Sequence, residues 1–139
     1  MKANLSMPAG ALALALAFAL NAVGATLPPA KMENGVTYVS GGIGHDESAA
    51  MKSEARDYPL SMVFSAGKDN EYVADVRIAI RDKAGKTVLN TVSDGPIMLV
   101  RVPAGRYSIA AETNGKKLRR TVQVNQKGDK QVNFHWPSA

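Results

Sequence analysis

The sequence contains no cysteine and only two histidines, His45 and His135, among its 139 residues. Without cysteine the chain has no disulfide, no thiolate nucleophile and no lipid-modified cysteine anchor. A serine nucleophile would need one of the two histidines as its base, and neither lies in a Gly-x-Ser-x-Gly motif. We therefore expect a domain stabilised by packing alone, with no catalytic residue, no metal ligand and no cofactor.

Long apolar runs are also scarce, and the one present, from Ala9 to Leu20, lies close to the N-terminus. It follows Lys2, precedes several small residues, and is shorter than the ~20 apolar residues that a membrane-spanning helix needs. This arrangement is typical of a secretory signal peptide, with cleavage after Ala25 or, as the second choice, after Ala22. The sequence predicts a signal peptide at 1–25 and a mature chain without a transmembrane segment, located in the periplasm or, alternatively, secreted.

Removal of the 25 residues of the predicted signal peptide leaves 114, the length of a single domain.

Acidic residues are rare in the last third of the chain. Residues 26–100 carry 8 Lys or Arg against 10 Asp or Glu, whereas residues 101–139 carry 8 against 2. Nucleic acid is not an expected partner of an exported domain, so this excess of positive charge needs another explanation.

Four of these cations, Lys116, Lys117, Arg119 and Arg120, gather beside one predicted turn. We interpret the cluster as a candidate surface for an unknown envelope protein or an anionic glycan or lipid. Arg101 and Arg106 are candidate neighbours of the cluster. Its alternative role is to discourage edge-to-edge pairing of strands, for which edge lysines are commonly used.

From Tyr58 onward the hydrophobic pattern has a period of two, as half-buried strands require. The faces predicted to be buried include Leu60, Met62 and Phe64, then Tyr72, Ala74, Val76, Ile78 and Ile80, and finally Val132, Phe134 and Trp136. Arg77 and Arg81 lie on the opposite, solvent-facing side of their strand. Asn114-Gly115 predicts a tight hairpin, because both central positions of a type I′ turn need positive φ. About seven short strands separated by turns predict a mainly β fold, an antiparallel seven-stranded β-sandwich at 58–139.

The residues ahead of the sandwich divide into two parts. Residues 26–35 contain Pro28, Pro29, Asn34 and Gly35 and are predicted to form an extended lead-in segment. Residues 36–57 are predicted to form a short strand, a glycine hinge and a short surface helix at 45–56. Acids begin this helix and cations end it, in agreement with the helix dipole.

The glycine hinge and the helix start supply the second candidate partner surface. Its residues are Gly41, Gly42, Gly44, His45, Asp46 and Glu47. Adjacent residues fan around a helix axis, which is poor geometry for a metal site, and the hinge lacks the residues of a phosphate-binding loop. The acids are then expected to satisfy free amides of the helix N-terminus, and a partner-binding loop is the alternative.

Several turn motifs follow one another between Val76 and Val124. They are Asp82-Lys83-Ala84-Gly85-Lys86, Asp94-Gly95-Pro96, Val102-Pro103-Ala104-Gly105-Arg106-Tyr107 and Asn114-Gly115-Lys116. In this order the segment resembles the carboxypeptidase regulatory-like domain family, whose members are transthyretin-like (prealbumin-like) β-sandwiches related to Cna-B modules. The resemblance extends loosely to Tyr58 and Trp136, and the whole is similar to small exported single-domain proteobacterial members of the family.

The resemblance implies a non-enzymatic periplasmic binding or accessory module whose ligand is unknown. One alternative is a small metal-dependent or hydroxyisourate-type hydrolase that uses His45 and His135. Hydroxyisourate hydrolases share the transthyretin-like fold but end in a Tyr-Arg-Gly-Ser motif, which this chain lacks. The other alternative is a structural subunit that pairs with a partner by strand addition. Tyr38, Tyr58, Tyr72 and Trp136 are aromatic residues that could stack on a sugar, although core or rim packing is the commoner role.

Overall fold

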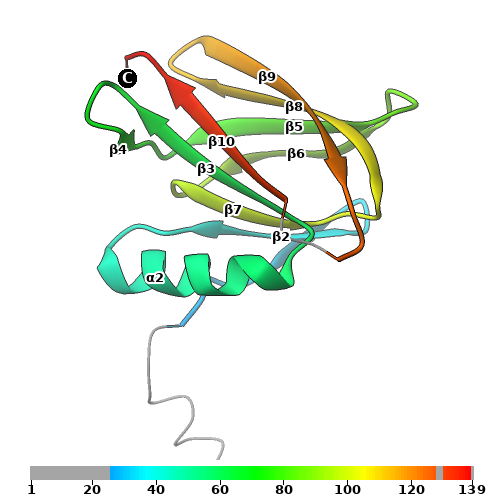
Figure 1. Ribbon diagram of the computed structural model, residues 1–139, viewed down its shortest axis with the longest axis horizontal. Helices are drawn as coiled ribbons and strands as arrows, with labels where there is room; N and C mark the ends of the chain where they lie inside the picture. Colours follow the sequence, from blue (N-terminus) through cyan, green and yellow to red (C-terminus); the bar gives the residue numbers. More distant parts are fainter. Residues whose placement is uncertain (1–25, 128–129, 139) are drawn as a thin grey trace, which may run out of the picture.

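The computed structural model describes residues 26–127 and 130–138. The signal peptide predicted at 1–25 lies outside these residues. Within them, no helix combines the length and the apolar character needed to cross a membrane. Figure 1 shows a three-layered arrangement, in which a helix covers the outer side of one sheet and a second sheet packs on its inner side.

The larger sheet, sheet A, has the strand order β1-β2-β7-β3-β10, with β4 paired to β3. Its strands are β1 (Lys31–Glu33), β2 (Val36–Gly41), β3 (Leu60–Ala66), β4 (Glu71–Tyr72), β7 (Ile97–Arg101) and β10 (Lys130–Trp136). Sheet B has the order β6-β5-β8-β9, formed by β5 (Val76–Asp82), β6 (Thr87–Ser93), β8 (Gly105–Thr113) and β9 (Lys116–Val124). The helix α2 (His45–Glu54) and the 3-10 helix η1 (Ala55–Asp57) connect β2 to β3.

The predicted class, a mainly β sandwich preceded by a short helix, is confirmed. The predicted count of seven strands is wrong, because the described residues form a six-stranded and a four-stranded sheet. Of the three additional strands, β2 was expected but placed ahead of the sandwich, and the two that were missed are short, since β1 has 3 residues and β4 has 2. Segments of that length are too short to show a period of two, so alternation cannot reveal them.

The predicted lead-in segment at 26–35 ends in a hairpin turn. Asn34 and Gly35 have φ values of 52° and 79°, and β1 pairs antiparallel with β2 across them. The Asn114-Gly115 turn has the same signs, with φ values of 50° and 75°, and joins β8 to β9 as predicted. Strand β2 also pairs with β7, so sheet A begins before the expected sandwich boundary at residue 58.

One strand pair, β3 with β10, is parallel, whereas the other pairs within the described residues are antiparallel. Strand β9 ends at the edge of sheet B, and β10 begins at the edge of sheet A. The chain therefore crosses from one sheet to the other instead of reversing within a sheet, and such a crossover permits parallel pairing. This pair differs from the expected antiparallel sandwich.

The main core lies between the inner faces of the two sheets. Met62 and Phe64 of β3 are fully buried, as the alternation predicts. Phe64, Phe134 and Trp136 form an aromatic group with ring centroids 6.0 to 6.5 Å apart. The Trp136 indole Nε1 donates to the carbonyl of Lys116 at 3.0 Å. The predicted core position of Trp136 is confirmed.

A second apolar cluster lies on the outer face of sheet A, under α2. Val39 of β2 and Ile97 and Leu99 of β7 are buried there, together with Met51 of the helix. Met51 is the buried residue of α2, whose other side chains are exposed or half-buried. The predicted surface helix thus serves as a cover for sheet A.

The stretch from Tyr72 to Ile80 does not form one strand. Asp75 has a φ of 58°, in the left-handed region, and β5 begins only at Val76. Tyr72 belongs to β4 and is 49% exposed. The prediction that Tyr72 shares the buried face of Val76 and Ile78 is therefore wrong, because the left-handed residue interrupts the extended backbone on which alternation depends.

Candidate binding surface

In Figure 1 no described helix or strand lies over the outer side of sheet B. Side chains alternate along its strands, so the inner residues are buried and the outer residues face solvent. In β5, for example, Ile78 and Ile80 are buried whereas Arg77 and Arg81 are exposed. The character of this face is therefore set by every second residue of the sheet.

The register of the strands determines which outer residues are neighbours. Across β5, β8 and β9 the rows are Arg77-Glu112-Lys117, Ala79-Ala110-Arg119 and Arg81-Ser108-Thr121, with the pair Arg106-Gln123 beyond them. Adjacent strands lie ~4.8 Å apart, so each row brings its side chains close together. We call this surface the basic face and define it by its cations, Arg77, Arg81, Arg106, Lys117 and Arg119.

Within these rows one carboxylate, Glu112, faces the five cations of the basic face. No cation of the face forms a salt bridge, because the single one in the described part of the chain joins Lys31 Nζ to Asp94 Oδ2 at 3.6 Å. Small side chains such as Ala79 and Ala110 lie between the cations. The result is a flat surface whose positive charge is largely uncompensated, and such a surface attracts anions.

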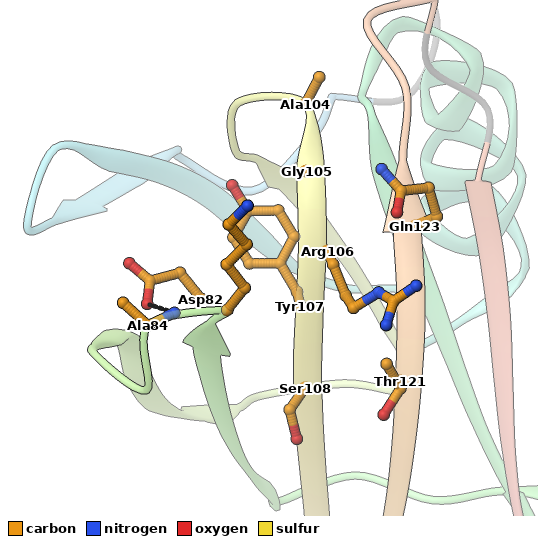
Figure 2. Close-up of a pocket in the computed structure, with 10 residues that line it drawn as sticks. Asp82, Ala84, Ala104, Gly105, Arg106, Tyr107, Ser108, Thr121 and Gln123 are labelled. Atoms are coloured by element: carbon orange, nitrogen blue, oxygen red, sulfur yellow. Dashed lines mark hydrogen bonds between the residues drawn. The ribbon is translucent and has the colours of Figure 1, made fainter.

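A groove of about 940 Å³ lies at one end of the basic face. Figure 2 shows Arg106 on one side of β8 and Tyr107 and Asp82 on the other. The Asp82 Oδ1 atom accepts the backbone N–H groups of Ala84 at 3.0 Å and Lys86 at 2.9 Å. The charged residues that line the groove are Asp82, Lys83 and Arg106, and Arg106 is the one on the β9 side of β8.

Tyr107 anchors the turn that precedes β8. Its hydroxyl donates to the carbonyl of Pro103 at 2.7 Å, and its side chain is buried in the main core. Burial raises the pKa of the Tyr107 phenol, and the carboxylate of Asp82 raises it further.

The four predicted hairpin cations do not form one cluster, because neighbours on a strand point to opposite sides. Lys117 and Arg119 belong to the basic face. The Arg120 guanidinium lies on the core side, 5.7 Å from the ring centroid of Phe134. Lys116 Nζ donates to Ser138 Oγ at 2.9 Å. Half of the predicted set is therefore on the basic face.

The remaining cations of the face come from other strands. Arg106 is one of the expected neighbours and does lie there. Arg101 does not: it belongs to sheet A, and its guanidinium carbon lies 4.6 Å from the ring centroid of Tyr58. Arg77 and Arg81 were missed as members of the site, although the alternation had placed them on a solvent-facing side.

The glycine hinge and the helix start lie on sheet A, separate from the basic face. The Glu47 Oε1 atom accepts the backbone N–H groups of Gly42 at 2.8 Å and Ile43 at 3.3 Å. Gly44, with a φ of 91°, precedes the helix, and its carbonyl accepts the N–H of Ser48 at 3.0 Å. The Glu47 carboxylate therefore occupies two amides of the glycine hinge, which precede α2, and not amides of the helix N-terminus as the sequence predicted.

The other residues of this candidate surface have different surroundings. His45 and Asp46 begin α2 with exposed side chains. Gly41 is buried against the turn between β6 and β7, where a Cβ on Gly95 would overlap the Gly41 carbonyl. Gly95 thus allows the turn to touch the backbone of β2, and Gly41 leaves room for the side chains of Pro28 and Glu47, so both glycines have a packing role.

The two histidines are placed on different elements. His45 is the first residue of α2, whereas His135 lies in β10 with its Nδ1 atom 3.0 Å from Ser65 Oγ. The groove that contains His135 is lined on the helix side by Lys52 and Ala55. Among the described residues, no group of three or more His, Asp or Glu is arranged to hold a metal ion.

Comparison with known proteins adds little to this picture. No family model matches the sequence. No curated protein sequence matches it. Among solved structures, the chain is similar to the 5-hydroxyisourate hydrolase of Klebsiella pneumoniae, with 16% identity and a TM-score of 0.41 over 59% of this chain and 92% of that one. A similarity this low carries no information about activity. The fold and the surface define a helix-covered β-sandwich with one basic face.

Proposed function

We propose that this chain is a non-enzymatic binding or accessory module of the cell envelope, which contacts an anionic partner through the basic face. The observation that carries the proposal is the set of five cations, with one acid, on an uncovered sheet face. These cations belong to paired strands of one sheet, so the spacing of their backbone positions is fixed before a partner binds. Positive surfaces of this kind favour anionic glycans, lipid headgroups or acidic protein patches.

The export part of the proposal rests on the sequence alone. Lys2, the apolar run and the small residues before Ala25 support a cleaved signal peptide and a periplasmic, or alternatively secreted, protein. The turn motifs support membership of the carboxypeptidase regulatory-like type. Mass spectrometry of the protein purified from a bacterial host that expresses the full chain checks this part, and we expect an N-terminus at Thr26.

The binding part is tested with two matched double variants. Arg77→Glu with Arg119→Glu reverses two charges on the basic face. Arg56→Glu with Lys68→Glu reverses two exposed charges elsewhere, so both variants lower the net charge by the same amount. Binding is measured by co-sedimentation with phosphatidylglycerol vesicles and by retention on heparin, each at several salt concentrations.

We expect salt-sensitive binding that falls about tenfold or more in the basic-face variant and changes little in the control. Vesicles and heparin distinguish a lipid from a glycan partner. Equal losses in the two variants would mean that net charge alone drives the association, and would remove the basic face from the proposal. If the unchanged protein binds neither the vesicles nor heparin, the basic face is also removed from the proposal.

A further inference from the structure

A second concave surface lies on the outer face of sheet A, on the other side of the sandwich from the basic face. It is a groove of about 660 Å³ between α2, β4 and the paired strands β3 and β10. Small-molecule sites commonly have volumes of ~300–1,000 Å³. The rungs of its floor are Ser61 with Gln131, Val63 with Asn133, and Ser65 with His135. We call it the polar groove.

The floor of the polar groove presents polar side chains that donate and accept hydrogen bonds. Gln131 Nε2 donates to Asn133 Oδ1 at 3.0 Å, and Ser65 Oγ lies 3.0 Å from His135 Nδ1. Each of these groups keeps further donor or acceptor capacity toward the groove. Sugar hydroxyls also donate and accept, so a polyhydroxylated ring complements this floor.

One wall supplies an aromatic ring with free surface. Tyr72 is 49% exposed, whereas Tyr38 is 7% and Trp136 is 1% exposed. Tyr58 is half-buried and packs against the apolar cluster under α2, and the Arg101 guanidinium lies over its ring. Among the four aromatic residues considered for sugar stacking, Tyr72 is therefore the most exposed, and the part of its ring that the Lys52 ammonium leaves uncovered is open to a ligand. Such a ring has an apolar body and a polar tip, as stacking beside hydrogen-bonding groups requires.

The charge of the polar groove is set by Lys52. Its Nζ atom lies 5.5 Å from the ring centroid of Tyr72. Among the described residues that line the groove, Lys52 supplies this ammonium and none supplies a carboxylate. A ligand with an anionic substituent next to the stacked ring would gain a charge-assisted contact there, while a cationic ligand would be repelled.

We propose that the polar groove binds a sugar ring that carries a carboxylate. Tyr72 packs on the ring, Lys52 pairs with the carboxylate, and the Asn133 and His135 side chains bond to the hydroxyls. This site shares no residue with the basic face, so the two proposals can fail separately.

Glucuronate and glucose are the probes for this proposal, because they differ in the carboxylate. Titration of the isotopically labelled protein, followed by backbone amide NMR, should show saturable shifts along β10 and β4. We expect a dissociation constant of about 1 mM for glucuronate, as is reasonable for one small ring, and at least about fivefold weaker binding of glucose.

Four variants separate the parts of the site. Tyr72→Ala should weaken glucuronate binding about tenfold, while Tyr72→Phe should retain it, since stacking needs only the ring. Lys52→Gln should remove the preference for glucuronate over glucose. Arg119→Gln, on the basic face, is the control and should leave both titrations unchanged.

The proposal is overturned by equal affinities of the unchanged protein for the two sugars, or by no saturable shift with either. Undiminished binding by a folded Tyr72→Ala variant would also overturn it, as would groove shifts that appear only with an acidic tripeptide. If Tyr72→Ala does not fold, two other variants provide the test. His135→Ala removes a hydrogen-bonding group from the floor of the groove, and Lys52→Gln removes its positive charge.

Discussion

The part of sheet A under α2 and the outer face of sheet B have opposite chemistry. On sheet A the outer residues Val39, Ile97 and Leu99 are apolar and lie under α2. On sheet B they are mostly charged, polar or small, as at Arg77 and Ala79, with Val92 as an exposed apolar exception, and no described helix or strand covers them. Exposed apolar surface costs about 25 cal/mol per Å², so sheet A needs a cover and sheet B does not. The comparison separates the part of sheet A that the helix buries from the two surfaces that are available to a partner, the basic face and the polar groove.

The largest expected effect is on the covered face. Leu99→Ala should lower the free energy of unfolding by about 2–5 kcal/mol, because Leu99 is fully buried between β7 and the helix. Val92→Ala on sheet B, where the side chain is 38% exposed, is the matched control and should cost about 0.5 kcal/mol or less. Urea unfolding of both variants checks this, and equal losses would show that the helix is not part of the core.

A smaller effect is expected where the helix is attached to sheet A. Glu47→Ala removes the acceptor of the Gly42 and Ile43 amides and should cost about 1 kcal/mol. Glu47→Gln keeps an acceptor oxygen and should lose less. Thermal unfolding of the pair measures the difference, and a Gln variant as unstable as the Ala variant would contradict the assigned role of the carboxylate oxygen.

The two sheets also differ in how their tyrosines titrate. Burial, followed by the charge of Asp82, raises the pKa of Tyr107 in sheet B. Hydrogen bonding from Lys52 lowers the pKa of Tyr72 beside sheet A, and the charge of Lys52 acts in the same direction, while burial opposes both. In ultraviolet titrations, Tyr72→Phe should therefore lack a tyrosine that titrates below the ordinary pKa, and Tyr107→Phe should lack one that titrates above it.

The signs of the linked stability changes are opposite. For Tyr107 the unfolded chain loses its proton first, so stability falls as pH rises past the ordinary tyrosine value of ~10. For Tyr72 the folded chain loses its proton first, so stability rises between the lowered pKa and that value. Urea unfolding across this alkaline range checks both signs. Profiles of the Tyr107→Phe variant that run parallel to those of the unchanged protein would contradict the raised pKa.

The smallest effect is expected on the bare face. Arg77→Gln with Arg119→Gln should change the free energy of unfolding by no more than about 0.5 kcal/mol, because both side chains are exposed and form no salt bridge. A loss above 1 kcal/mol, beyond the ~0.5 kcal/mol typical of surface substitutions, would mean that these cations support the fold. Thermal unfolding followed by circular dichroism measures this change in the free energy of unfolding.

The inner faces of the sheets could be predicted because burial follows a period of two along each strand. Phe64, Phe134 and Trp136 were placed in the core on that basis, and they lie there. The pattern failed at Tyr72, where one left-handed residue, Asp75, interrupts the extended backbone. Alternation alone does not report such a local change of φ.

The basic face could be predicted only in part, since it depends on strand order. The alternation placed Arg77 on a solvent-facing side, but nothing near Arg77 in the sequence indicates that β8 lies between its strand and that of Arg119. Sequence proximity instead grouped Arg119 with Arg120, which points to the core side. Neighbours across a sheet are set by tertiary pairing, which local sequence does not encode.

The pairing of β3 with β10 has a consequence for how the chain reaches its folded state. Ser65 and His135, which meet in this pair, are 70 positions apart, and closing so long a loop is entropically costly and slow. In a chain that emerges N-terminus first, β3 lacks its parallel partner β10, and Phe64 lacks its neighbour Phe134, until β10 appears. We expect the native state to form only after β10 has emerged, so a chain that stops before β10 would stay unfolded.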